Sequence, residues 1–224
     1  MQNNIVVQEN GENKPEEFQS EISTLTVFSS ENNFQNALVM ASELAKSDLI
    51  PVSYKNKPAN CLIAIELSNR LGLSPFLIMQ NMHVIQGRPS WASTFIISCI
   101  NASGKFSGCL KFEMDEQKTK CRAYAVEKCT GNKLTGPLVS MEMAEAEGWL
   151  GKNGSKWKTM PELMLRYRAA AFFGRLYCPE IMNGMLTSEE ATDIEHFSKV
   201  TKENQKAENV LELKPEVIKN ETDK

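Results

Sequence analysis

The chain has 224 residues, enough for one domain with a hydrophobic core and irregular ends, or at most two small domains. Its hydrophobic content of 42% is ordinary for a soluble globular protein, and its apolar runs are too short to cross a bilayer, so no membrane span is expected. A signal peptide is not expected either, and the singly scattered cysteines favour reduced thiols in a cytoplasmic protein.

The net charge of −3 hides an uneven distribution of charge along the chain. Residues 51–178 carry 17 Lys and Arg against 9 Asp and Glu, which leaves 8 basic and 19 acidic residues of the totals of 25 and 28 for the two ends. A basic middle between acidic ends is typical of a domain that binds a polyanion. Acidic ends that only keep a domain soluble give the same pattern, so both interpretations stay open.

Residues 1–29 are polar and acidic, and we expect them to be mostly disordered. Ser29 or Ser30 can cap a first helix that runs to about Lys46. Pro58 suits the first turn of a second helix, and Gly72 suits its left-handed end. A short helical turn at 74–79 then leads to a short strand at 82–86.

The middle of the chain predicts strands and two further helices. After a turn at 87–89, Ser90 is expected to cap a third helix that contains Trp91. Partial alternation at 106–114 and 120–128 predicts two strands joined by a hairpin turn. A third strand is expected at 134–139, followed by a short helix at 141–147.

A long helix is predicted within Trp157–Tyr177. Pro161 suits its first turn, and one apolar stripe recurs at helical spacing: Leu165, Ala169, Phe172 and Leu176. At roughly 100° per residue, Arg168 and Arg175 share one flank of this stripe and Arg166 lies on the other. A final helix is expected from about Thr187, and the Lys/Glu-rich residues 199–224 are expected to be disordered or partner-binding. One folded domain, 30–198, is therefore predicted between two polar ends.

Basic and aromatic residues interleave in this domain in a way that suits nucleic acid. Lysine and arginine contact phosphates, and aromatic rings can stack on the bases of a single strand. The candidate DNA-binding residues are Arg88, Trp91, Lys111, Arg122, Lys152, Lys156, Trp157, Lys158, Arg166, Arg168 and Arg175. For both tryptophans the alternative is packing in the core, and for the arginines it is a solvated flank of a core helix.

Signals for an enzyme are weaker. Glu113, Asp115 and Glu116 could hold a divalent metal in a nuclease, but carboxylates are also common at hairpin turns. The chain has no C-x-x-C pair, its two histidines are far apart, and we find no P-loop or nucleophile elbow. We therefore expect no catalytic residue, no metal site and no cofactor.

Several short motifs, in order, resemble the RecT/Redβ family of phage single-strand annealing proteins. Three lie in the first half: Pro58-Ala-Asn-Cys-Leu-Ile-Ala-Ile-Glu-Leu, Leu71-Gly-Leu-Ser-Pro and Gln86-Gly-Arg-Pro. A later one, shared with the Redβ branch, is Trp157…Pro161-x-x-Met164-Leu165-Arg166-x-Arg168-Ala169…Arg175-Leu176. The resemblance covers residues 34–190, and at Glu162 the Redβ branch has a lysine instead.

The resemblance implies an α+β fold related to Rad52-type annealing proteins, with a small antiparallel sheet backed by a long helix and additional helices. It implies that domain 30–198 binds single-stranded DNA and anneals complementary strands without ATP, on a homo-oligomeric ring or helical filament, in phage recombination. Arg168 and Arg175 would line the DNA groove, with Trp91 near it and Mg²⁺ only as a modulator. Implied partners are the annealed duplex, a phage exonuclease and a host single-strand-binding protein, in the bacterial cytoplasm. A metal-dependent nuclease and a protein-interaction module are the alternatives.

Overall fold

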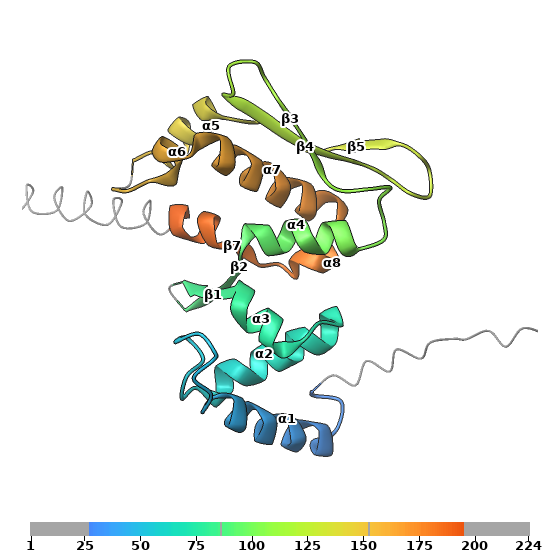
Figure 1. The fold of residues 1–224 in the computed structure, drawn as a ribbon, viewed down its shortest axis with the longest axis vertical. Coiled ribbons are helices and arrows are strands. Elements are labelled where there is room, and N and C mark those ends of the chain that lie inside the picture. Colours follow the sequence, from blue (N-terminus) through green and yellow to red (C-terminus); the bar gives the residue numbers. More distant parts are fainter. Residues whose placement is uncertain (1–26, 86, 152, 195–224) are drawn as a thin grey trace, which may run out of the picture.

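The computed structural model describes residues 27–85, 87–151 and 153–194 and has the predicted α+β class (Figure 1). Among these residues no single helix is long and apolar enough to cross a membrane. The helices Pro58–Leu71 and Pro75–Asn81 pass that test only when taken together, and they are bent by 112° relative to each other.

A last helix begins at residue 188 and is described as far as 194. The elements before it are α1 (Glu31–Leu44), α2 (Pro58–Leu71), α3 (Pro75–Asn81), β1 (Met82–Ile85), β2 (Arg88–Trp91), α4 (Ser93–Ala102), β3 (Lys111–Met114), β4 (Lys120–Val126), β5 (Lys133–Thr135), β6 (Val139–Ser140), α5 (Met141–Ala146), α6 (Lys156–Thr159), α7 (Pro161–Tyr177), α8 (Pro179–Met182) and β7 (Leu186–Thr187).

Helices α1, α2 and α3 form the lower end of the molecule in Figure 1. The Ser30 side chain accepts a hydrogen bond from the Asn33 N–H, which confirms the predicted cap of α1. Gly72 ends α2 at φ 66°, the left-handed conformation that glycine adopts without steric cost. Residues 1–29 were expected to be mostly disordered, but Val27 is buried and its N–H donates to Glu66 Oε2 at 2.9 Å, so the folded domain includes residues before Ser30. Residues 1–26 and 195–224 lie outside the described residues.

A small sheet with the order β1-β2-β7 crosses the middle of the molecule. It corrects two predictions, since Ser90 and Trp91 belong to strand β2 and helix α4 begins only at Ser93. The physical reason is a parallel pairing of β2 with β7, in which Ser90 and Trp91 lie opposite Leu186 and Thr187. Such a distant partner leaves no local signal in the sequence, and it makes this sheet mixed rather than antiparallel.

A second sheet, β3-β4-β5 with β6 also paired to β4, is antiparallel and packs on α7 (Figure 1). Cys121, Ala123 and Ala125 alternate along β4 and are buried on its inner face. Their small size lets α7 approach closely, and a Cβ at Gly136 would meet both the Ala123 carbonyl and Phe173 at 3.3 Å. The predicted hairpin and helix are thus confirmed, but the strand expected at 106–114 is shortened to β3 at Lys111–Met114. The strand expected at 134–139 is split into β5 and β6.

The buried face of α7 differs from the predicted stripe. Leu165 and Ala169 are buried, but Phe172 is only half-buried and Leu176 is exposed. The reason is that α7 packs on the sheet and also on α4 and α8. Its buried arc is therefore wider than one stripe and includes Phe173 and Gly174, whose added Cβ would lie 3.1 Å from the Met182 sulfur.

Candidate nucleic-acid interface

Arg168, which the resemblance placed in a DNA groove, is 7% exposed in the structure. Its Nη2 donates to Asp193 Oδ2 at 2.6 Å, and its Nε lies 3.8 Å from Glu190 Oε1. The guanidinium also stacks on the Trp149 ring, 3.7 Å from the ring centroid. Burial lowers the pKa of Arg168, and the neighbouring charges of Glu190 and Asp193 act in the opposite direction. In this conformation Arg168 is a buried, charge-compensated side chain, and it does not line an open groove.

Arg175 lies two turns further along α7 and forms a bidentate ion pair with Glu190. Its Nη1 donates to Oε1 at 2.8 Å, and its Nη2 donates to Oε2. Glu190 also accepts from the Thr187 N–H at 2.9 Å, while the Glu190 N–H donates to Thr187 Oγ1 at 3.2 Å. This is a capping box, so one buried carboxylate caps its own helix and holds two arginines of α7. The prediction that Arg168 and Arg175 share a flank is confirmed. On that flank both side chains contact carboxylates.

Because Arg175 and Arg168 stabilise the negative charge of Glu190, the stability of the fold should depend on pH. Burial tends to raise the pKa of Glu190, but the hydrogen bond and charge of Arg175 and the charge of Arg168 outweigh it and hold the pKa below its ordinary 4.5. A carboxyl whose folded pKa is depressed stabilises the fold above the unfolded pKa, and this contribution is lost as the pH falls through the folded pKa. In urea titrations from pH 7 to pH 3, we expect the difference between wild type and Glu190→Gln to shrink below about pH 4.5. A difference that stays constant over this range would contradict the assignment.

Both tryptophans in the candidate set are fully buried, which corrects their predicted role as stacking platforms. Trp91 packs against Phe95 with ring centroids 4.8 Å apart. Trp157 packs against Trp149, and its Nε1–H donates to Asp193 Oδ2 at 3.1 Å. An indole without exposed surface cannot stack on a base, so the core-packing alternative holds for both residues.

The other basic candidates occupy several surfaces. Arg88 is exposed on β2, and Lys156 lines a hollow of about 430 Å³ with His83, Met164 and Glu189. Lys158 and Arg166 are exposed on α6 and α7, and Lys152 lies outside the described residues. Glu162, the acid that departs from the Redβ branch, pairs with Lys118 at 2.9 Å and joins the hairpin turn to α7.

Lys111 and Arg122 come together on the outer face of the second sheet. The register places Lys111 opposite Tyr124 and Glu113 opposite Arg122, and Lys133 follows on β5 opposite Val126. Their side chains point away from the buried face of β4, and no described element covers that side in Figure 1. We define the open sheet face by six residues: Lys111, Glu113, Lys120, Arg122, Tyr124 and Lys133.

The open sheet face carries one aromatic ring and four cations. Lys133 Nζ lies 4.0 Å from the centroid of the Tyr124 ring and also pairs with Glu113. Lys120 lies 3.8 Å from Glu142 on α5, while Lys111 and Arg122 form no ion pair within the described residues. Four cations and one carboxylate share this face with the half-buried Tyr124, and such a face can hold phosphates and stack a base. The alternation in 120–128 could have indicated Tyr124, since it places Tyr124 and Arg122 on one face, whereas Lys133 reaches this face only through the pairing of β5 with β4.

Two of the three acidic residues proposed for a metal, Glu113 and Asp115, are engaged in other contacts. Glu113 pairs with Lys133, and Asp115 accepts from the N–H groups of Thr119 and Lys120 in the hairpin turn. Within the described residues, no group of three or more metal-ligating side chains comes together. All six cysteines are free thiols.

Comparison with known proteins identifies no relative of this chain. No protein-family model matches the chain, and no curated protein matches it. Its similarity to the RecT/Redβ family therefore stays a prediction that depends on the sequence motifs quoted above.

Proposed function

We propose that this protein binds single-stranded DNA and anneals complementary strands without ATP, as a homologous-recombination protein of a phage or prophage in the bacterial cytoplasm. The observation that carries the proposal is the open sheet face, where Lys133 lies over the Tyr124 ring and Lys111 and Arg122 share the same face. The sequence resemblance supports it independently, and so does the basic balance of residues 51–178. We extend the proposal to a Rad52-like core, of which the antiparallel sheet on α7 would be the central part.

The open sheet face suits a single strand better than a duplex. A flat sheet lets successive phosphates reach cations spaced along the strands, and the Tyr124 ring offers a surface for one unpaired base. In a duplex the base faces are already stacked and unavailable. The face lies on strands held by α7, so its cations are positioned before DNA arrives, which lowers the cost of ordering them on binding.

Annealing itself would need no catalytic group, because no covalent bond is made or broken. Backbone contacts would supply affinity and base pairing would supply specificity, with Mg²⁺ at most modulating the phosphate contacts. A homo-oligomer would hold one strand across several subunits while a complementary strand pairs with it. A phage exonuclease and a host single-strand-binding protein would then be the natural partners. The nuclease alternative is less well supported, since Glu113 and Asp115 are bound to other groups.

The proposal is tested by following the pairing of complementary oligonucleotides by fluorescence. We expect wild type to accelerate pairing, and we expect Tyr124→Leu to weaken single-strand binding by about 1–3 kcal/mol, or about five- to 150-fold, because a base-stacking ring is lost. Tyr124→Phe keeps the ring and is the matched control. No acceleration by wild type would contradict annealing, and equal binding by the Leu and Phe variants would exclude stacking on Tyr124.

A further inference from the structure

The Lys133 side chain crosses the central strand of the second sheet. It starts on β5 and its Nζ lies 2.5 Å from Glu113 Oε1 on β3, although β4 lies between these two strands. The same Nζ lies over the ring of Tyr124 on β4, 4.0 Å from the ring centroid. One ion pair therefore spans the sheet and covers one face of the aromatic ring. We call this pair of Lys133 with Glu113 the lysine strap.

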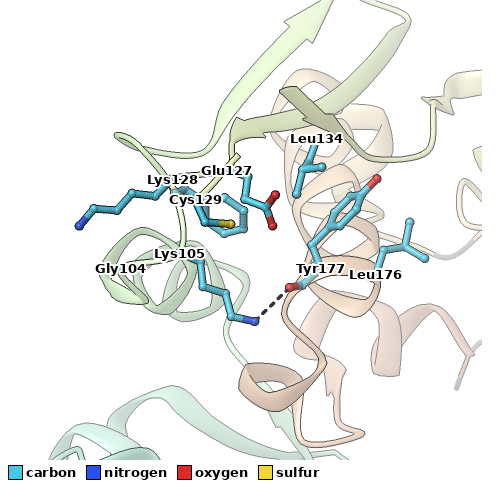
Figure 2. Close-up of a pocket in the computed structure, with 9 residues that line it drawn as sticks. Gly104, Lys105, Glu127, Lys128, Cys129, Leu134, Leu176 and Tyr177 are labelled. Atoms are coloured by element: carbon cyan, nitrogen blue, oxygen red, sulfur yellow. Dashed lines mark hydrogen bonds between the residues drawn. The ribbon is translucent and has the colours of Figure 1, made fainter. Parts of the chain in front are cut away.

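The strand that carries the lysine is held in place by α7. Leu134, which follows Lys133 on β5, lines a hollow of about 770 Å³ beside Tyr177 (Figure 2). The Tyr177 hydroxyl donates to the Thr135 carbonyl at 3.0 Å and so fixes β5 against the helix. Successive residues of a strand point to opposite faces, so the inward Leu134 keeps Lys133 on the open sheet face. Opening the lysine strap therefore requires a movement of the Lys133 side chain only.

A phosphate can compete for the lysine of this strap. The side chains of Lys133 and Glu113 are 47% and 49% exposed, and an ion pair this exposed adds little stability because water screens it. A phosphate offers the same ammonium group a comparable charge-assisted hydrogen bond. Glu113 is not isolated when Lys133 leaves, since it lies opposite Arg122, whose guanidinium has enough donors for a carboxylate and a phosphate together. The exchange of partners by Lys133 is therefore easy.

We infer that Glu113 is a specificity-determining residue of the open sheet face. It holds Lys133 over Tyr124, so a base can stack on the covered face of this ring only when an accompanying phosphate takes the lysine. A polynucleotide carries a phosphate beside each base and does both at once, whereas a neutral aromatic group finds this ring face closed. The site thereby favours a strand over free bases. The inference rests on the proposed function, because it describes how the same site selects its ligand.

Nuclear magnetic resonance of the full chain, labelled isotopically in its lysine side chains, tests the lysine strap without a ligand. Protons over an aromatic ring resonate upfield, so the Lys133 ε-methylene signal, identified by its loss in Lys133→Gln, should lie upfield of its ordinary position. Glu113→Gln should return it to that position. Glu116→Gln is the matched control, since it removes an exposed charge from the hairpin turn of the same sheet and should leave the signal upfield. A wild-type signal that is not upfield, or one that Glu113→Gln does not move, would overturn the inference.

Ligands with and without phosphate then test the selection. An abasic oligonucleotide, which has phosphates but no bases, and a normal oligonucleotide should both move the Lys133 signal from its upfield position. Deoxyadenosine, a base without phosphate, should leave it there. Deoxyadenosine that moves the signal, or a normal oligonucleotide that binds while the signal stays upfield, would overturn the inference. A wild type that shows the upfield signal but binds neither oligonucleotide would overturn the proposed function and leave the lysine strap standing.

Affinity gives a second measure of the role of Glu113. In Glu113→Gln no ion pair has to be broken, so the normal oligonucleotide should bind more tightly than to wild type, by up to about fivefold. Glu116→Gln removes the same charge without touching the lysine strap, and it should tighten binding less. Equal increases in the two variants would overturn the role of Glu113 and leave the proposed DNA binding intact.

Discussion

Replacing Glu190 by glutamine is expected to lower the free energy of unfolding by about 3–5 kcal/mol, the usual cost of removing one partner from a buried ion pair. Glu190 is 4% exposed and accepts from both Arg175 nitrogens and from the Thr187 N–H. Glutamine has nearly the same shape but cannot compensate a guanidinium. Arg168 would then share its buried site with Asp193 alone, and Arg175 would lose its partner. Urea unfolding followed by circular dichroism measures the change.

Two further variants show whether this cost comes from burial. Glu43→Gln removes an exposed partner, since Glu43 and Lys46 are both about two-thirds exposed, and we expect it to cost less than about 1 kcal/mol. Arg175→Gln with Glu190→Gln removes both members of the bidentate pair. It should cost less than the two single changes together, because neither group is then left without its partner. Additive costs would show that Arg175 and Glu190 do not interact as described.

The local signals in the sequence predicted local structure well. The Ser30 cap of α1 and the left-handed Gly72 at the end of α2 are both confirmed, because the groups that form a helix cap lie within one helical turn of each other. The β3–β4 hairpin is confirmed for a similar reason. Its two strands are joined by a short turn in which Asp115 binds the Thr119 and Lys120 N–H groups.

The predictions that were wrong concern residues whose partners in the fold are distant in sequence. Ser90 is a good helix cap by type, but it pairs with Leu186 in a strand. Arg168 and Arg175 were correctly placed on one flank of α7, yet helical geometry cannot indicate that Glu190 and Asp193 return to cover them. One signal for this was present, because Thr187-Ser-Glu-Glu190 has the capping-box pattern, which predicts a helix that begins there. Only the structure shows that this helix packs against α7 and contacts Arg168 and Arg175.

The second large effect is expected at the open sheet face. Lys111→Gln with Arg122→Gln should reduce the affinity for a single-stranded oligonucleotide by about 25-fold at 0.1 M salt. Each phosphate contact with a single strand adds about 0.7 to the slope of log K against log salt concentration, which is about fivefold at this salt. The slope should therefore fall by about 1.4 for the double variant. Fluorescence anisotropy over a range of salt concentrations measures both quantities.

The matched control is Lys46→Gln with Lys57→Gln, which removes two exposed positive charges from the α1–α2 end and leaves the open sheet face intact. It should change the slope little. If the control lowers affinity as much as Lys111→Gln with Arg122→Gln does, binding follows net charge and has no defined path on the protein.

Arg175→Gln distinguishes the open sheet face from the groove that the family resemblance implies. Arg175 is already bound to Glu190, so DNA could use it only by displacing a carboxylate from a bidentate pair. We therefore expect this variant to lose stability and to keep the wild-type salt slope at temperatures where it remains folded. A slope reduced by about 0.7 in Arg175→Gln and unchanged in Lys111→Gln with Arg122→Gln would place the DNA along α7 instead. In that case the helix that begins at residue 188 would have to move away from α7 before a strand could bind.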